Sequence, residues 1–484
     1  MIVVAITGPR SRDALDQLRT SQPFADMFEF RLDLLTDPDT ARLFRATRKP
    51  VIATCRPVRE GGRFRGSESL RMRRLLDAVR AGAAYVDIEL DAHAVFGRML
   101  REAVLRPRLI VSRHLFGQKL PHVRRDYARL RATGAEVIKL SYEASDAWQI
   151  APALEFLARA SADRQKAIAV ARGEAGEASR ILYRRFGGWA TYAGTEDGKG
   201  SAPGQLPASI MKNVFSAHLR TRRTKVFGLV GLPVSQSSGI YIHNPIYRRQ
   251  RVDAVYVRFP VSNLRLFMQK IGPVLSGCSV TIPHKRAMMK FLSSAQPSVG
   301  AIGAVNTIVR RRRGWLGANT DAGAALDAIE ERGSVAGRSM LILGTGGSAR
   351  AIALEARLRG ALVTVAGRRP HRVSALARAT GAAGIGWNQI PAGRWNILVN
   401  TTPVGMWPRA GEMPIKRISP GTDVVFDAIY NPVKTELLRK AESAGASIVS
   451  GVEMFVKQGA GQIALFTGKR PEEGLLRRLL MSAP

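Results

Sequence analysis

The sequence predicts an α/β protein in two parts: a closed eight-stranded (β/α)₈ barrel, followed by a two-domain α/β unit. Short β-type runs alternate with helical patterns through residues 1–218. Further on, a strand, a glycine-rich turn and a helix follow one another, as in dinucleotide-binding folds. At 484 residues the chain is also too long for one ordinary hydrophobic core.

Eight β-type runs carry the barrel prediction, and helical patterns with apolar residues at i, i+3 and i+4 separate them. They span residues 2–7, 27–32, 51–55, 85–90, 108–112, 136–141, 166–171 and 189–194. Eight β/α units of this size are typical of a TIM barrel, whose active site lies at the carboxyl ends of the strands. A doubly wound open sheet is the alternative, but no glycine-rich phosphate loop follows the first run.

The charge balance is strongly basic, with 74 Lys and Arg against 38 Asp and Glu and a net charge of +36. Most of these arginines are scattered through helical patterns, and only residues 220–223 and 310–313 form compact runs. This scatter favours solvated arginine-rich faces over a specific nucleic-acid surface. A positive field would attract anionic small-molecule substrates in either case.

The same composition indicates a cytoplasmic protein. No run of uncharged apolar residues is long enough to cross a membrane. Met1 leads directly into a strand-like run, so we expect no secretory signal. Cys55 and Cys278 fall in different halves, so a disulfide framework is not expected. We expect no metal site either.

Charged residues interrupt the predicted barrel strands. Glu29 and Arg31 lie in the second run, Arg56 ends the third, His114 follows the fifth and Lys139 lies within the sixth. Barrel interiors are apolar, so each such charge needs a partner or a role. A lysine at a strand end that reaches solvent is the simpler interpretation. Converging cations would instead depress the lysine pKa and favour imine formation with a ketone, with His114 moving protons and the arginines holding a carboxylate.

Several motifs follow one another in this half: EFRLD (29–33), TCR (54–56), EGG (60–62), SRH (112–114), VIKL (137–140), GEASR (176–180) and SAPGQ (201–205). Together they resemble the type I 3-dehydroquinate dehydratases. The resemblance implies that Lys139 forms a Schiff base with the substrate ketone. His114 would transfer the proton, oriented by Glu60. Substrate would be bound by Glu29, Arg31, Arg56, Arg180, Ser201 and Gln205.

The second half opens with a strand at 225–230 and a loop rich in Ser and Gly. Free hydroxyls and amides there can bind a carboxylate, although an ordinary β-turn-α connection fits as well. Lys285 follows VTIP and Asp321 follows Asn-Thr. The two residues would be a proton-transfer pair if they meet in space, and surface charges if they do not.

The last third carries the dinucleotide pattern. A strand at 339–343 leads into Gly344, Gly346 and Ala349, and a helix follows. Glycines at these positions let the backbone approach a pyrophosphate at the helix N-terminus. The next strand ends in Arg368 and Arg369, where an acid would select NAD. Two guanidiniums without a carboxylate predict NADP as the cofactor.

The strings VTIPHK, GAVNT, GANTD, GTGGSA, NTTPVGM, FDAIYNP and GVEMFVKQ resemble shikimate dehydrogenase across about residues 225–484. The resemblance implies hydride transfer from NADPH to the ketone of 3-dehydroshikimate, with Lys285 and Asp321 as the catalytic pair. Ser237, Asn306, Tyr430 and Gln458 would bind substrate. The cofactor residues would be Gly344, Gly346, Gly347, Ala349, Arg368, Arg369, Thr402, Val404 and Met406. One departure is Gly239, where the family commonly has a second serine for the substrate carboxylate.

The expected layout is a dehydratase barrel over 1–219, a linker at 220–224, a substrate-binding domain over 225–335 and a Rossmann NADP domain over 336–452. Helices from about 453–484 would complete the substrate-binding domain. Such a chain would catalyse two consecutive steps of the shikimate pathway, which leads to chorismate and the aromatic amino acids. A quinate-type reductase, one silent half and a basic nucleic-acid binder are the alternatives. The oligomeric state is open, with a dimer as one prediction, and channelling is a hypothesis that rests on the fusion alone.

Overall fold

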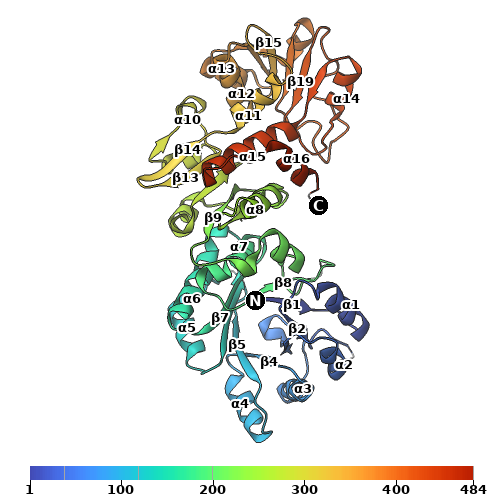
Figure 1. Cartoon of the computed structure of the whole chain (residues 1–484), viewed down its shortest axis with the longest axis vertical. Helices are drawn as coiled ribbons and strands as arrows, with labels where there is room; N and C mark the ends of the chain where they lie inside the picture. Colours follow the sequence, from blue (N-terminus) through green and yellow to red (C-terminus); the bar gives the residue numbers. More distant parts are fainter. Residues whose placement is uncertain (37–38, 118, 199, 483–484) are drawn as a thin grey trace. The chain divides into compact units, whose positions relative to one another are not determined.

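The computed structural model describes residues 1–36, 39–117, 119–198 and 200–482. The chain divides into two compact units (Figure 1). The first holds Met1–Ile240 and Arg251–Leu275, and the second holds Tyr241–Gln250 and the chain from Ser276 onward.

Eight parallel strands form the sheet of the first unit. They are β1 (Ile2–Ile6), β2 (Met27–Arg31), β3 (Val51–Thr54), β4 (Tyr85–Glu89), β5 (Arg108–His114), β6 (Val137–Glu143), β7 (Lys166–Arg172) and β8 (Thr191–Ala193). Their order is β7-β6-β5-β4-β3-β2-β1-β8. At the seam, the Trp189 N–H donates to the Ala167 carbonyl at 2.9 Å, which nearly closes the barrel. The barrel prediction is confirmed, and the open doubly wound alternative is wrong.

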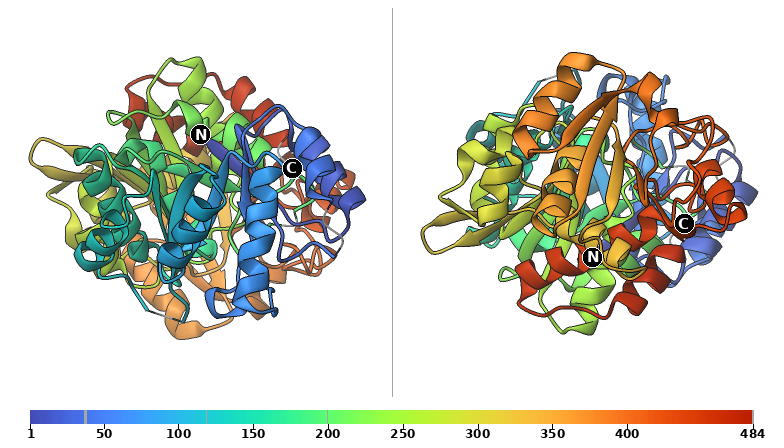
Figure 2. Two further views of the ribbon diagram at one scale, coloured as in Figure 1. Left: turned by 90° about the horizontal axis from the view of Figure 1, so that it is seen from below. Right: turned by 90° about the horizontal axis from the view of Figure 1, so that it is seen from above.

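Helices cover the outside of these strands, as Figure 1 and the left view of Figure 2 show. They are α1 (Ser11–Ser21), α2 (Thr40–Arg45), α3 (Glu68–Arg80), α4 (His93–Glu102), α5 (Val123–Arg131), α6 (Ala151–Ala162) and α7 (Glu177–Ile181). α3 illustrates why they form: the Ser67 side chain accepts from the Leu70 N–H, and Met72 and Leu75 are buried on one face.

An apolar layer fills one end of the barrel and displaces polar side chains to the other end. It includes Val3, Met27, Ile52, Tyr85, Ile110, Val137 and Ile168. Because strand side chains repeat every two residues, the next inward position on β2 is Glu29 and on β6 is Lys139. The layer therefore ends where the candidate site begins.

The segment after the barrel differs from its prediction. The sequence predicts one closing helix over residues 210–219, but the structure has a π-helical turn at Ile210–Val214 and a 3₁₀ turn at Ala217–Leu219. Ser216 breaks the helix with a φ of 46°. Arg220, in the predicted linker, is buried and donates to the Ala254 carbonyl at 2.8 Å. This linker residue is thus fixed in place within the first unit.

Two further strands belong to the first unit, β9 (Lys225–Gly231) and β10 (Ala254–Pro260), and they pair in parallel. α9 (Leu264–Lys270) follows β10. α8 (Gly239–Arg249) lies between the two strands in the sequence.

The second unit begins with a largely antiparallel set of strands. β11 (Gly277–Val280) pairs with β13 (Thr307–Arg311), and β13 pairs with β14 (Gly314–Ala318). The short β12 (Ser294–Ala295) adds to β14. α10 (Pro297–Ile302) precedes β13, and α11 (Asp321–Glu330) follows β14.

A parallel sheet forms the rest of the second unit, in the order β17-β16-β15-β18-β19-β20. Its strands are β15 (Ser339–Leu343), β16 (Leu362–Gly367), β17 (Ala383–Gly386), β18 (Ile397–Asn400), β19 (Val424–Asp427) and β20 (Ser447–Val449). The helices are α12 (Gly347–Leu358), α13 (Pro370–Thr380), α14 (Glu436–Ser443), α15 (Gly451–Thr467) and α16 (Glu473–Met481). The right view of Figure 2 shows the orange strands between helices. This is the predicted Rossmann arrangement.

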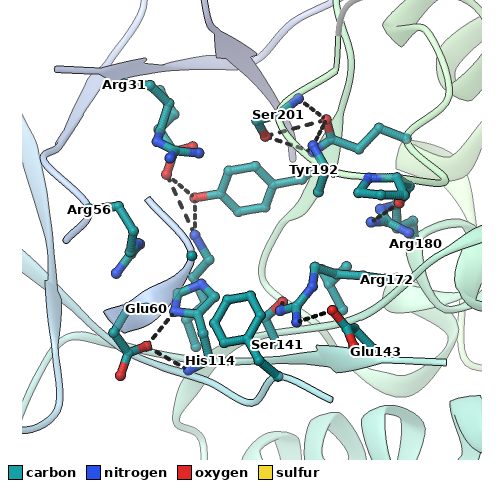
Figure 3. A pocket seen from close by; sticks show the side chains of 18 residues that line it. Arg31, Arg56, Glu60, His114, Ser141, Glu143, Arg172, Arg180, Tyr192 and Ser201 are labelled. Carbon is teal, nitrogen blue, oxygen red and sulfur yellow. Dashed lines mark hydrogen bonds and ion pairs between the residues drawn. The ribbon is translucent and has the colours of Figure 1, made fainter. Parts of the chain in front are cut away.

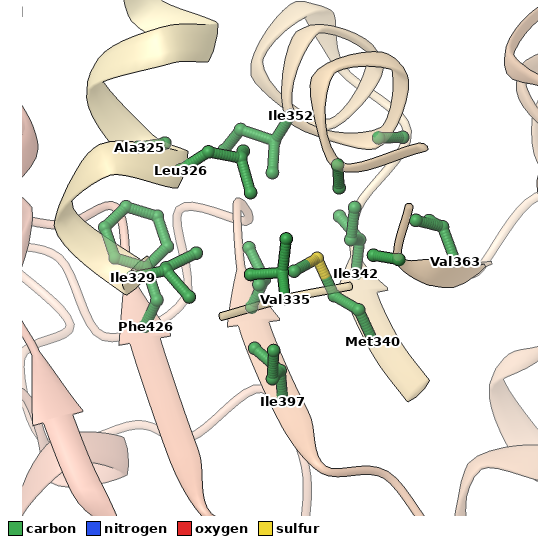
Figure 4. Packing of buried hydrophobic residues seen from close by; sticks show 14 of the residues in the cluster. Ala325, Leu326, Ile329, Val335, Met340, Ile342, Ile352, Val363, Ile397 and Phe426 are labelled. Carbon is green, nitrogen blue, oxygen red and sulfur yellow. The ribbon is translucent and has the colours of Figure 1, made fainter. Parts of the chain in front are cut away.

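Buried aliphatic side chains tie this sheet to its helices. Ile329 of α11, Ile352 of α12 and Ile342 of β15 meet in one cluster with Ile397 and Phe426 (Figure 4). Burying each such side chain contributes on the order of 1.5 to 3 kcal/mol. The cluster fixes the start of α12, and with it the glycine-rich turn.

Two candidate active sites

The first site is a cavity in the first unit, at the carboxyl ends of the barrel strands (Figure 3). Every barrel residue predicted for the site lines it, although they come from elements far apart in the sequence. They are Glu29, Arg31, Arg56, Glu60, His114, Lys139, Arg180, Ser201 and Gln205. The position of the cavity is the one that barrel enzymes use for catalysis.

Lys139 lies on the floor of this cavity and is only 6% exposed. Its Nζ donates to Asp87 Oδ2 at 2.8 Å and to the Tyr192 hydroxyl at 2.9 Å. Glu29 Oε1 lies 3.5 Å away. The sequence led us to expect cations around the lysine, but its nearest charged neighbours are carboxylates. The amine is thereby held at one point in a buried, polar setting.

His114 and Glu60 form a proton-transfer pair. Glu60 Oε2 lies 3.2 Å from His114 Nδ1 and also accepts from the His114 backbone N–H at 3.1 Å. Burial, with help from Arg56 and Lys139, holds the pKa of His114 well below its usual value. Burial also raises the pKa of Glu60 to about 7. A neutral imidazole with Nδ1–H directed at an ionised Glu60 leaves Nε2 as a base.

Beside Lys139, a buried ionic network lies behind the cavity lining and reaches it through Arg56. Arg56 Nη2 lies 2.8 Å from Asp87 Oδ1, and its Nη1 lies 2.7 Å from Glu89 Oε1. Ser112 Oγ donates to Asp87 at 2.6 Å. Burial alone would raise the pKa of Asp87, but the charges of Arg56 and Lys139 outweigh burial and lower the pKa below its usual value. The carboxyl therefore stays ionised. The guanidinium of Arg56 is thus already paired with two carboxylates of the protein, and it orients Asp87 toward the lysine.

Arg180 and the loop at 201–205 form the opposite side. Arg180 is 1% exposed and donates to the Ala171 carbonyl at 2.9 Å and the Pro203 carbonyl at 3.4 Å. Burial lowers its pKa to about 10, so it stays cationic at neutral pH. The Ser201 N–H donates to Gln205 Oε1 at 2.7 Å, which fixes the loop. A guanidinium held in this way can accept a substrate carboxylate.

Arg172 is a further cation of the cavity. It donates to Ser141 Oγ at 2.9 Å and to the Leu115 carbonyl at 2.7 Å, and it stacks on Phe116 at 4.3 Å. The Phe116 ring lies over Gly61, where a Cβ would meet a ring carbon at 2.2 Å. Only glycine therefore fits beside Glu60, and Arg172 supports the aromatic ring that covers it.

The second site belongs to the second unit and centres on Lys285 and Asp321. Lys285 follows β11, and Asp321 is the first residue of α11. Their Nζ and Oδ2 atoms lie 2.6 Å apart. An acid in the first turn of a helix is also favoured by the helix dipole. The two residues meet in space, as a proton-transfer pair requires.

Asn306 connects this pair to its surroundings. Its Nδ2 donates to Asp321 Oδ1 at 2.8 Å and lies 3.4 Å from Gln458 Oε1 of α15. Tyr430, after β19, packs against Phe455 with ring centroids 5.1 Å apart. Asn306 and Gln458 thus share the site with Asp321, whereas no contact described for Tyr430 reaches Lys285 or Asp321. Ser237 belongs to the other unit, where its Oγ accepts from the Gly239 N–H at 3.3 Å.

The glycine turn after β15 forms an open cradle at the start of α12. Nothing lies within 4 Å of a Cβ placed on Gly346 or Gly347. Gly344 has a φ of +115° and passes close to Thr401 Oγ1. Ala349 is fully buried in the core beneath, so it shapes the turn from inside. Open space beside the glycines and a helix N-terminus fit a pyrophosphate.

One cavity extends from this cradle past β16. Its lining includes Arg368, Arg369 and Arg372 on one side and Thr402 and Val404 on another. Met406 lies outside this lining and is 47% exposed. Arg368 and Arg369 directly after β16, together with Arg372 in the first turn of α13, fit the 2′-phosphate of NADP. A second cavity shares Gly346 and Arg372 and includes Gly347 and Lys285.

Two family models match parts of this chain. Residues 2–220 match the family model of type I 3-dehydroquinase. Residues 229–308 match the shikimate dehydrogenase substrate binding domain. The chain is 34% identical to the chloroplastic bifunctional 3-dehydroquinate dehydratase/shikimate dehydrogenase of Arabidopsis thaliana, over 96% of this chain and 82% of the relative.

The chain belongs to this bifunctional dehydratase/dehydrogenase family. It is also 36% identical to the shikimate dehydrogenase (NADP(+)) of Pyrococcus abyssi, over 53% of this chain and 97% of that protein. A similar solved structure is quinate dehydrogenase from Corynebacterium glutamicum in complex with NAD, with 26% identity and a TM-score of 0.50. The match covers 54% of this chain and 99% of the quinate dehydrogenase chain. Among the described residues, none of the helices is long and apolar enough to span a membrane.

Sequence reasoning missed several residues that line the dehydratase cavity or support its lining from behind. Asp87 and Glu89 stand inside a predicted strand, so the signal that singled out Glu29 and Lys139 was available for them. Arg172 ends the seventh strand and carried the same signal. Tyr192, an aromatic residue in a strand, gives no such signal, because core tyrosines have the same pattern.

Proposed function

We propose that the barrel dehydrates 3-dehydroquinate to 3-dehydroshikimate through an imine on Lys139, and that the second half reduces this product to shikimate with NADPH. Lys139, held on the floor of a cavity that also contains the His114–Glu60 pair, is the observation that carries the proposal. Membership in the bifunctional family supports both activities.

The dehydratase step follows from the positions of three groups. The Lys139 amine adds to the substrate ketone and loses water, which gives an imine. His114 Nε2 removes a proton from the adjacent carbon, and the electron pair moves toward the imine nitrogen. The hydroxyl group then leaves as water with the proton from His114, and hydrolysis frees Lys139. The Tyr192 hydroxyl accepts from Nζ and donates to Glu29, so the two side chains hold the nitrogen in place throughout.

Substrate binding falls to the opposite wall. Arg180 presents a cation whose partners within the protein are main-chain carbonyls, so it can take the substrate carboxylate. Ser201 and Gln205 lie beside it and would bind ring hydroxyls. Arg31 is paired with Asp33 at 2.8 Å, so it helps to shape the site. Glu60 keeps His114 in the tautomer that can act as a base.

In the second half, Lys285 would give a proton to the ketone oxygen while Asp321 holds its ammonium group. Asn306 and Gln458 would bind ring hydroxyls, Ser237 the carboxylate, and Tyr430 would line the site. Bound NADPH supplies the hydride. Its pyrophosphate would lie over Gly344, Gly346 and Gly347, its 2′-phosphate against Arg368 and Arg369, and its nicotinamide side near Thr402, Val404 and Met406.

Quinate-type reduction is a second candidate for this half. Gly239 in place of a carboxylate-binding serine and the similarity to a quinate dehydrogenase favour it. A lost charge-assisted hydrogen bond costs on the order of 1.5 to 3 kcal/mol, which would raise KM without abolishing activity. Oxidation of shikimate and of quinate with NADP would decide between them: kcat/KM at least tenfold higher for shikimate supports the first proposal, and the reverse supports the second.

We further propose the domain layout given by the sequence: a barrel over 1–219, a connector at 220–224, a substrate-binding domain over 225–335 and an NADP domain over 336–452. The contact of Gln462 in α15 with Ser279 at 2.8 Å supports the assignment of the C-terminal helices to the substrate-binding domain. A cytoplasmic location fits free cysteines, since Cys55 and Cys278 are both unpaired and buried. A dimer stays a prediction, which light scattering would test.

A further inference from the structure

Within the first unit, one ion pair joins the dehydratase part of the chain to the dehydrogenase part. Arg258 on β10 lies in the region that matches the shikimate dehydrogenase model, and Glu177 at the start of α7 lies in the region that matches the dehydratase model. Nε of Arg258 lies 3.2 Å from Oε1 of Glu177, and Nη2 lies 2.8 Å from Oε2. The side chains are only 13% and 8% exposed. A buried two-point contact of this kind fixes both distance and orientation.

On the dehydratase side, the pair stands directly behind the substrate-binding wall. α7 carries Glu177 and, one turn later, Arg180, whose guanidinium lines the cavity and contacts the carbonyl of Pro203 in the loop at 201–205. Burial raises the pKa of Glu177, and Arg258 opposes this shift. The charge of Glu177 in turn favours the cationic form of Arg180. Arg258 thus holds α7 in position and favours the ionised form of Glu177, which in turn favours the cationic form of Arg180.

On the dehydrogenase side, the same guanidinium holds a loop. Its third nitrogen, Nη1, donates to the carbonyl of Ser235. Ser235 is two residues before Ser237, which caps the Gly239 N–H at the start of α8. This is the loop that would bind the substrate carboxylate of the reductase, and Gly239 leaves it with one serine fewer than the family pattern. A fixed backbone matters more where one side-chain donor is missing.

We propose that Arg258 is a positioning residue for both reactions: through Glu177 it holds α7 behind Arg180, and through Ser235 it holds the substrate loop of the dehydrogenase. The inference rests on the proposed function, because it assigns substrate carboxylates to Arg180 and to the loop around Ser237. It adds a physical link between the two substrate-binding regions that the fusion alone does not provide.

A separate contact supplies the matched control. Asp146 of the barrel accepts from the Ser262 N–H at 3.0 Å and from the Asn263 N–H at 2.8 Å, after the end of β10. It therefore also joins the two parts of the chain. Its side chain also accepts from the Trp148 N–H, and none of its described hydrogen bonds reaches α7 or the loop at 235–239. Asp146→Asn therefore weakens the attachment of the two parts while it leaves the bonds of Arg258 to Glu177 and Ser235 in place.

The experiment measures each half-reaction separately in the full-length chain, for wild type, Arg258→Met, Glu177→Gln and Asp146→Asn. Arg258→Met is expected to raise KM for 3-dehydroquinate and KM for 3-dehydroshikimate by roughly tenfold each, with kcat changed less than about twofold. Glu177→Gln is expected to raise mainly the dehydratase KM, because Arg258 keeps its bond to Ser235. Asp146→Asn is expected to change neither KM.

An Arg258→Met protein with one or both KM values unchanged overturns the proposal, as does an Asp146→Asn protein with the same double shift. If Arg258→Met does not fold, Arg258→Lys is measured in its place. Lysine keeps the positive charge but cannot make the two-point contact of the guanidinium with Glu177. Both KM values are then expected to rise about fivefold, and unchanged values contradict the proposal. A wild-type protein inactive on both substrates would contradict the proposed function instead, so the two failures are distinguishable.

Discussion

The Nζ of Lys139 lies 2.8 Å from Oδ2 of Asp87, a carboxylate that is completely buried. Arg56 and Ser112 hold the other oxygen of Asp87. The amine that we propose as the nucleophile is therefore placed by a carboxylate that is itself fixed from behind. Position, more than a ring of cations, distinguishes this lysine from one that merely reaches solvent at a strand end.

Asp87→Asn should lower dehydratase kcat by about 100-fold, because the amine loses its fixed acceptor and Arg56 loses an ionic partner. Unpairing a buried charge also costs about 3 to 5 kcal/mol, so the melting temperature should fall. Steady-state kinetics and calorimetry measure the two effects. The dehydrogenase activity serves as the internal control, and a variant with normal dehydratase kcat would show that Asp87 does not place Lys139.

Lys139→Ala should abolish covalent trapping by borohydride. Wild-type protein incubated with 3-dehydroquinate and sodium borohydride should gain the mass of one reduced substrate adduct, located on the peptide that contains Lys139. Lys166, an exposed lysine at the start of β7, offers a matched control, and Lys166→Ala should be labelled like wild type. Labelling of Lys139→Ala would rule out the assigned nucleophile.

The dehydratase should gain activity as pH rises through about 7. Glu60 is protonated below its raised pKa of about 7, and only its ionised form fixes the His114 tautomer. Burial sets this value, against the opposing effect of Arg56 and with smaller additions from Glu89 and Asp91. Titration of His114 does not change the activity near pH 7, because burial holds its own pKa well below the usual value of 6.5.

A pH profile of dehydratase kcat/KM checks this assignment. In Glu60→Gln the limb near pH 7 should disappear and the residual rate should be lower. The dehydrogenase profile of the same variant should match wild type. If the limb persists in Glu60→Gln, another group titrates it.

Arg368→Ala and Arg369→Ala should each raise KM for NADPH by roughly tenfold and leave KM for NADH unchanged. Both side chains line the cavity beside the glycine cradle, where the 2′-phosphate would lie. Arg311→Ala, in an exposed position of β13, is the control for loss of net charge. Equal use of NADH and NADPH by wild type would contradict the role of the two arginines.

The sequence was most informative where periodicity and chain order determine structure. All eight barrel strands and the glycine turn of the dinucleotide domain follow from local pattern. Residues 210–219 did not, because a left-handed Ser216 divides an otherwise helical segment and no local residue preference signals it. The approach of Lys285 to Asp321 depends on how β11 and α11 pack together, which composition does not encode. The convergence of carboxylates on Lys139 likewise depends on the curvature of the barrel, because Glu29 on β2, Asp87 on β4 and Lys139 on β6 come from alternate strands.

The most direct test of the account is a coupled assay in which the purified chain receives 3-dehydroquinate and NADPH and no other enzyme. We predict that NADPH is oxidised in a one-to-one ratio with 3-dehydroquinate consumed. Lys139→Ala should oxidise NADPH only when 3-dehydroshikimate is supplied, and Asp321→Asn should let 3-dehydroshikimate accumulate. If wild-type protein oxidises NADPH with 3-dehydroshikimate but not with 3-dehydroquinate, the claim that one chain performs both steps is wrong.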